Sequence, residues 1–197
     1  MAKVKLTKNE LKRQKDMLKR FQRYLPTLVL KKQQLQMVIR QVEAEVRKKL
    51  DQQQKLNDDL MQWVAVFGED LALEELVRIS GINTEVGNIA GIDIPVFNRI
   101  EFEDISWDLF RYPLWVDAGV DRLKELLALD AEIRVLERQK ELIEEELRIT
   151  TQRVNLFEKV KIPEAKENIR MIRIYLGDQQ TAAVVRGKIA KSNIVEV

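Results

Sequence analysis

The stretch TKNELKRQKDMLKRFQRYLPTLVLKKQQLQMVI, residues 7–39, decides the fold of this 197-residue chain. Its apolar residues recur at alternating steps of three and four, and the pattern continues to about Ser80. A seven-residue repeat kept over many turns forms the narrow apolar seam of a coiled coil. At about 1.5 Å per residue, roughly 70 residues give a rod on the order of 105 Å. A helix of this length needs a second helix to cover its seam.

The start of this helix is predicted by its capping residues. Thr7 and Glu10 form a T-x-x-E capping box, in which the hydroxyl accepts from an early backbone N–H and the carboxylate reaches back to the cap. Pro26 lies inside the helical pattern and removes one backbone hydrogen bond. Because the apolar repeat keeps its phase on both sides, the sequence predicts a bend at Pro26 rather than a break.

The partner helix is predicted in the C-terminal part of the same chain. Residues 116–191 carry the same repeat, whose phase slips by one residue around Lys161–Pro163. The simplest arrangement folds this helix back antiparallel, with acidic Glu144–Glu146 near basic Arg47–Lys49. Such exposed ion pairs set register more than stability. The predicted seam contains Leu18, Leu25, Leu28, Leu35, Ile39, Val42, Val154, Phe157, Ile169, Ile172 and Leu176.

Between the two helices, residues 81–115 follow a different pattern. Glycines end the first helix, and the runs Ile82–Gly87 and Gly91–Arg99 are predicted to form a β-hairpin that turns near Asn88–Gly91. Two strands alone are marginal in water, so the hairpin must lie on the helices or on a partner. An acidic connector follows, and its aromatic residues favour local packing or a subunit contact about equally. The candidate contact residues are Trp107, Phe110, Tyr112 and Trp115.

The predicted fold class is therefore mainly α. The N- and C-terminal helices are expected to form a long antiparallel two-helix coiled coil, with a small β-hairpin and a short helical segment at the loop end. All 197 residues are expected to form one elongated domain. Its parts are the helix 7–80, the hairpin and aromatic connector 81–115, and the helix 116–191.

Composition and motifs point away from catalysis. The chain has no Cys and no His, which removes disulfides, thiol chemistry, most zinc sites and the commonest general base. Gly187–Lys188 lacks the upstream glycine of a phosphate-binding loop. We therefore expect no catalytic residue, no cofactor and no metal. No apolar run approaches the roughly 20 residues needed to cross a bilayer, and the start has no signal-peptide core, so a cytoplasmic protein is expected.

Charge is distributed unevenly along the chain. Residues 1–50 hold 15 Lys and Arg against 4 Asp and Glu, whereas residues 51–110 hold 3 against 13. A basic half of this kind is compatible with nucleic-acid binding. Aromatic residues are few there, however, and most of the basic side chains flank the seam, where their stems cover apolar surface. Nucleic acid is therefore not the expected partner.

Several short motifs carry a resemblance to a known family. The run Arg153–Glu158, followed by Ile162-Pro163 and the spaced aliphatic residues Ile169, Ile172 and Leu176, is similar to the C-terminal pattern of the D subunit of V-type and archaeal-type rotary ATPases. The N-terminal runs Leu6–Leu11 and Leu30–Leu35 resemble its other signatures. Asn88-Ile89 and Ile94-Pro95-Val96 fit its hairpin. The resemblance covers nearly the whole chain, apart from Glu103–Leu123.

This resemblance implies a non-catalytic rotor shaft, peripheral to the membrane within a membrane-bound complex. Its implied partners are the catalytic and nucleotide-binding subunits of the ATPase head, a small central-stalk subunit and the adaptor to the membrane ring. The slender, basic termini are expected inside the head and residues 81–115 toward the membrane. A structural or chaperone-like coiled-coil hairpin without a rotor role is the alternative, which a stable symmetric homo-oligomer would favour.

Overall fold

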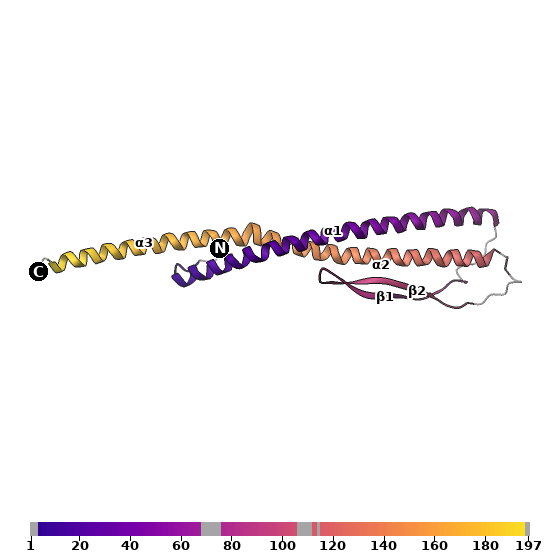
Figure 1. Ribbon diagram of the computed structural model, residues 1–197, viewed down its shortest axis with the longest axis horizontal. Helices are drawn as coiled ribbons and strands as arrows, with labels where there is room; N and C mark the ends of the chain where they lie inside the picture. Colours follow the sequence, from indigo (N-terminus) through magenta and orange to yellow (C-terminus); the bar gives the residue numbers. More distant parts are fainter. Residues whose placement is uncertain (1–3, 68–75, 106–111, 114, 196–197) are drawn as a thin grey trace. The chain divides into compact units, whose positions relative to one another are not determined.

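The computed structural model describes residues 4–67, 76–105, 112–113 and 115–195. Its elements are α1 (Lys8–Phe67), β1 (Ile79–Ile89), β2 (Ile92–Phe102), α2 (Val116–Asn155), the π-helical turn η2 (Leu156–Lys161) and α3 (Ile162–Val195) (Figure 1). The predicted fold class is confirmed: the protein is mainly helical, with long N- and C-terminal helices and one antiparallel hairpin. The chain packs as two compact units, which we describe separately. Unit 1 holds Met1–Lys32 and Ile149–Val197, and unit 2 holds Gln33–Arg148.

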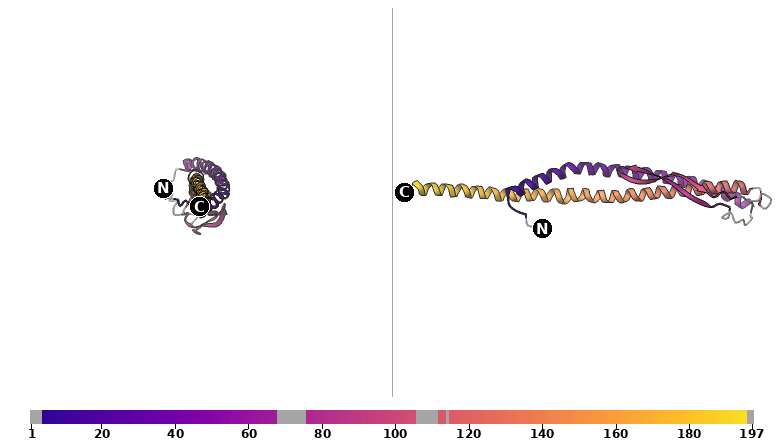
Figure 2. Two further views of the ribbon diagram at one scale, coloured as in Figure 1. Left: turned by 90° about the vertical axis from the view of Figure 1, so that its left-hand side faces the viewer. Right: turned by 90° about the horizontal axis from the view of Figure 1, so that it is seen from below.

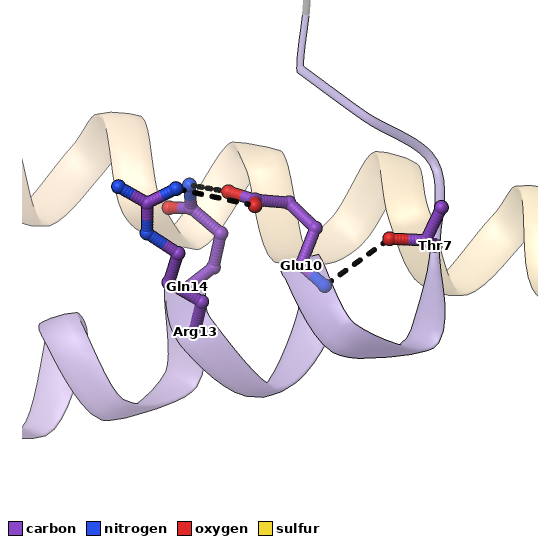
Figure 3. Close-up of polar contacts among 4 residues, drawn as sticks. All are labelled: Thr7, Glu10, Arg13 and Gln14. Atoms are coloured by element: carbon purple, nitrogen blue, oxygen red, sulfur yellow. Dashed lines mark hydrogen bonds and ion pairs between the residues drawn. The ribbon is translucent and has the colours of Figure 1, made fainter.

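The N-terminus of α1 has half of the predicted capping box. The Thr7 hydroxyl accepts from the Glu10 backbone N–H at 3.2 Å (Figure 3). The other half of the prediction is wrong, because the Thr7 N–H donates to the Lys5 carbonyl. The Glu10 carboxylate points along the helix instead, where it accepts from the Gln14 amide at 2.8 Å and lies 3.7 Å from the Arg13 guanidinium. Residues three and four positions further along lie on the same helix face, so both can reach this carboxylate.

The first helix continues through Pro26 but is shorter than predicted. Pro26 lies inside α1 without a break. The described helix ends at Phe67 rather than at Ser80, and β1 already begins at Ile79. Leu76 and Val77, which the repeat assigned to the helix, are buried outside regular helix. They pack with Val116 and Val120 of α2, so a tertiary contact overrides the local periodicity.

The hairpin is present where it was predicted, with longer strands than the runs 82–87 and 91–99. Its register pairs Ile79 with Phe102 at one end and Ile89 with Ile92 at the other. Ala90 and Gly91 form the turn with φ values of 54° and 81°, the left-handed geometry that suits the twist of a tight hairpin. The Asn88 side chain stabilises this turn by accepting from the Gly91 N–H at 3.1 Å.

Unit 2 consists of the hairpin packed on a pair of helices. In Figures 1 and 2 the hairpin runs along α2, on which α1 also lies. One apolar cluster joins all three elements, with Leu35 and Ile39 from α1, Ile143 from α2 and Ile94 from β2. The helix pair supplies the support that two strands alone lack.

Unit 1 is a pair of helices without a sheet. The first part of α1 faces the end of α2, the η2 turn and α3, with the Phe21 and Phe157 rings 5.1 Å apart. The predicted one-residue slip of phase is confirmed, because η2 lies directly before Ile162-Pro163 and the Ile162 N–H bonds to the Phe157 carbonyl, five residues back. The predicted single helix 116–191 is therefore two α-helices joined by a π turn, and α3 continues to Val195.

Candidate interaction surfaces

The candidate functional features among the described residues are surfaces. No three His, Cys, Asp or Glu side chains gather as a metal site within the part of the chain that the structure describes. Across the same residues, no helix is long and apolar enough to span a bilayer. The functional candidates are thus the seam, its polar positions and the exposed faces around it.

In unit 2, the predicted seam residues are buried. Leu35 is fully buried, and Ile39 and Val42 are buried beside it. These three predicted seam residues pack against Leu136 and Ile143 of α2. Periodicity could not show that Ile94 of β2 enters the same cluster, because the sequence gives no distance between a strand and a helix.

In unit 1, the seam is thinner. Val154, Ile169 and Ile172 are buried. The other predicted members are only half-buried: Leu18, Leu25, Leu28, Phe157 and Leu176. A seam between two helices with no third layer leaves its flanks open to water.

Polar residues occupy several buried positions that the seam prediction left out. Gln14, Thr150 and Asn168 are at least nine-tenths buried in unit 1. The Thr150 hydroxyl has no hydrogen-bond partner among the described residues. In unit 2, the buried Gln139 donates its side-chain amide to the Pro95 carbonyl and so ties α2 to β2. Gln139 lies beside the α2 stripe, and no sequence signal distinguishes it from a solvated glutamine.

Two ion pairs fix the helix register of unit 2, and this register differs from the predicted one. Lys49 lies 2.8 Å from Glu132, and Lys140 lies 2.9 Å from Glu43. Lys49 therefore faces a position more than a heptad away from Glu144–Glu146, and the predicted pairing is wrong. The helices are antiparallel as expected, but like and unlike charges recur at several offsets, so charge alone does not define the offset.

The Lys140–Glu43 pair shifts the titration of both groups. The hydrogen bond from the Lys140 ammonium lowers the pKa of the Glu43 carboxyl, and the same hydrogen bond raises the pKa of Lys140. Both side chains are partly exposed, so water screens the attraction. The pair therefore specifies alignment more than it stabilises the fold.

Of the four aromatic residues proposed for a partner contact, the structure describes two. Tyr112 and Trp115 are half-buried and pack against the cluster formed by Leu76, Val77 and Val116. Their described surroundings are thus local packing. Trp107 and Phe110 lie outside the described residues.

A basic groove runs between the two helices of unit 1. Leu18 of α1 and Ile169 of α3 are among its lining residues. Five cations and one carboxylate also line it: Lys12, Lys15, Lys19, Lys166, Arg173 and Asp16. None of the five cations has an ion pair within the described part of the chain. The groove therefore presents a net positive charge beside the apolar residues Leu18 and Ile169.

The C-terminal part of α3 is exposed over the stretch whose burial the structure describes. Between Gly177 and Ser192 no residue is buried, and Figure 2 shows α3 continuing past the start of α1. Val184, Val185 and Ile189 are about half exposed or more, at 60%, 49% and 55%. Val185 and Ile189 are one turn apart on the same face, as in helices that bind into a groove.

Known proteins match this chain along its length. The sequence model of the family described as the D subunit of ATP synthase matches residues 10–192. The D subunit of the V-type ATP synthase of Borreliella burgdorferi is 53% identical over 196 residues, covering 100% of this chain and 97% of that protein. The protein of the same name from Chlamydia pneumoniae is 33% identical over 201 residues, covering 97% and 93%. The chain belongs to the family of ATP synthase D subunits.

The resemblance stated from the motifs is thereby confirmed. In this member of the D-subunit family, the motif Arg153–Glu158 leads into the π turn, and Ile162-Pro163 begins α3 directly after it. The motif residues Ile169 and Ile172 form the buried seam of unit 1. Several of the motifs quoted for the resemblance therefore lie where the two terminal segments pack together.

Proposed function

We propose that this chain is the central shaft of a V-type rotary ATP synthase and transmits torque between the ATP-hydrolysing or ATP-synthesising head and the ion-translocating membrane ring. The observation that carries the proposal is the match to the D-subunit family over residues 10–192. In this role the chain contributes no catalytic group. It is a peripheral component on the cytoplasmic side of the membrane.

The surfaces of unit 1 support a contact with the head. The C-terminal part of α3 is slender, carries exposed aliphatic side chains and has small residues such as Ala182, Ala183 and Ala190. A smooth apolar tip turns inside a ring of subunits without locking to one of them. The nearby basic groove offers long-range attraction to acidic surfaces, which steers assembly. The catalytic and nucleotide-binding subunits are the proposed partners here.

The packing of unit 2 supports a rigid contact with partner subunits. The hairpin is held on the helix pair by Ile94 and by the Gln139–Pro95 hydrogen bond, so the outer face of the hairpin is rigidly supported. Val86 of β1 is 80% exposed on that hairpin. We propose the small central-stalk subunit and the adaptor to the membrane ring as partners of this unit.

Crosslinking in the assembled complex tests both assignments. The chain has no native Cys, so Ser192→Cys and Asp104→Cys each introduce a single reactive site at an exposed position. With a short photoreactive probe, the Ser192 site should capture head subunits, and the Asp104 site should capture stalk or adaptor subunits. The labelled chain alone serves as control.

Each other outcome has a defined meaning. The reverse pattern overturns the orientation, and no crosslink to either set overturns the rotor assignment. Capture of a second copy of this chain favours the coiled-coil hairpin protein without a rotor role. Tight ATP binding by the isolated chain in calorimetry, with micromolar affinity, contradicts the non-catalytic assignment.

A further inference from the structure

The π turn η2 is the one described segment where the long C-terminal helical stretch departs from α geometry. Its six residues, Leu156–Lys161, include none that is buried. Leu156 and Val160 are exposed to 44% and 49%, and the Phe157 ring rests on Phe21. π turns are rare and are often found at functional sites, because their wide hydrogen-bonded rings are less favourable than α turns.

The cause of the turn is an extra residue in the repeat. The seam passes through Val154 and Phe157 before the turn and through Ala165, Ile169 and Ile172 after it. If the repeat continued without interruption from Phe157, each later seam position would fall one residue before the buried residues Ala165, Ile169 and Ile172. One residue turns an α-helix by about 100°, so without the wide turn α3 would rotate its seam away from α1.

Pro163 favours the wide turn at this place. A proline within a helix has no N–H to donate, and its ring clashes with the carbonyl four residues back, here that of Lys159. Widening the turn before Pro163 moves that carbonyl aside. The extra residue and the proline thus act together, although neither is needed to build a seam between two helices.

We propose that η2, together with the extra residue that it absorbs, is a compliant joint in the shaft. A chain without that extra residue would form the same seam with a continuous α-helix, so the joint is kept for its flexibility. The turn lets α3 bend and twist relative to the end of α2, with the Phe21–Phe157 contact as its pivot. Segments with few buried contacts open and deform at low cost. This inference rests on the proposed rotor function.

The key variant removes the joint. Deletion of Lys159 together with Pro163→Ala restores an unbroken repeat and removes the proline, which should give a continuous α-helix. The matched variant Lys159→Ala with Pro163→Ala keeps the extra residue, so its π turn should persist. Lys159 is exposed and has no ion pair among the described residues, so its removal breaks no ion pair there.

Spin-label distances measure the compliance of the isolated chain directly. Labels on Gln152→Cys and Arg173→Cys, both exposed, are separated by roughly 30 Å along the helix. The distance distribution should be broad in the parent chain and in the matched variant, and narrow in the deletion variant. Equal widths in all three overturn the joint.

Thermal melting tests whether the joint is dispensable for packing. The deletion variant should melt at or above the temperature of the matched variant. Deletion of the exposed Glu145, inside α2, should instead lower the melting temperature by at least about 10 °C, because Leu147, Thr150 and Val154 leave the seam. Similar losses in both deletions overturn the phase argument.

ATP-driven ion pumping by the reconstituted complex tests the role of the joint. The deletion variant should assemble but pump fewer ions per ATP than the matched variant. Unchanged coupling overturns the mechanical role. If the parent chain itself fails to restore coupled activity, the rotor function fails, whereas the spin-label result still decides whether the joint exists.

Discussion

The two units solve the same packing problem in different ways. Unit 2 covers its helix pair with a hairpin, and a single dry cluster joins all three elements. In its described residues, unit 1 consists of the helix pair alone, with polar residues at several buried positions and no buried residue from Gly177 to Ser192 of α3. We therefore expect unit 2 to be the more stable of the two units, because more of its apolar side chains are covered.

The largest expected effect comes from placing a charge in each seam. Ile143→Asp should lower the free energy of unfolding by about 4 kcal/mol, because the carboxylate enters a sealed three-layer cluster. Ile172→Asp should cost less, about 3 kcal/mol, since water reaches the open flanks of the two-helix seam. Urea unfolding followed by circular dichroism measures both.

The solvated face of unit 1 supplies the control for these seam variants. Glu167→Lys exchanges an exposed residue and should change the free energy of unfolding by under about 0.5 kcal/mol. A greater loss for Ile172→Asp than for Ile143→Asp would reverse the comparison between the units.

A second prediction concerns how closely the hairpin strands fit. A Cβ on Gly87 would lie 2.7 Å from the Val96 side chain, whereas a Cβ on Gly81 of the same strand meets nothing within 4 Å. Gly87→Ala should therefore destabilise unit 2 by about 1–3 kcal/mol through overpacking. Gly81→Ala should be neutral or slightly stabilising, because alanine loses less backbone entropy on folding. Equal melting temperatures for the two variants would show that Val96 moves freely.

A third prediction concerns the polar seam of unit 1. Thr150 is almost fully buried, and its hydroxyl has no partner among the described residues. Thr150→Val keeps the shape and removes the unsatisfied group, so it should stabilise the chain by about 1 kcal/mol. Thr181→Val is the matched control, because the Thr181 hydroxyl is exposed and donates to the Gly177 carbonyl. A loss of stability in Thr150→Val would show that the hydroxyl is satisfied in solution.

The smallest expected effect is the pH dependence of the Glu43–Lys140 pair. Because the pKa of Glu43 is lowered from 4.5, its contribution to stability is present above pH 4.5 and is lost as the pH falls through the lowered value. Because the pKa of Lys140 is raised from 10.5, its contribution is present below pH 10.5 and is lost as the pH rises through the raised value.

Melting temperatures measure this pair. Glu43→Gln should melt slightly below the parent chain near neutral pH, and the difference should vanish in strong acid and shrink in high salt. Glu45→Gln, an exposed neighbour without an ion pair among the described residues, should show no such pH-dependent difference. A difference that persists in acid would mean that the pair acts through packing.

The sequence by itself determined the local features of this protein. The seven-residue repeat predicted the long helices, and alternation around Ile92 and Ile94 predicted the hairpin, because both patterns reflect which side of an element is buried. The sequence also showed the phase slip near Pro163 but predicted a single helix over residues 116–191. The structure shows that the extra residue is absorbed by the π turn η2. The short motifs predicted the family.

The tertiary structure decided what depends on distance between segments. The helix offset follows from Lys49 meeting Glu132 and from the hairpin cluster, whereas the repeating charges permit several offsets. Leu76 and Val77 lie outside regular helix, contrary to the prediction, because they pack against α2. Gln139 is buried because its side-chain amide donates to the Pro95 carbonyl. Periodicity in the sequence indicates that a side chain is buried. The residues that pack over it depend on distances between segments, which only the tertiary structure gives.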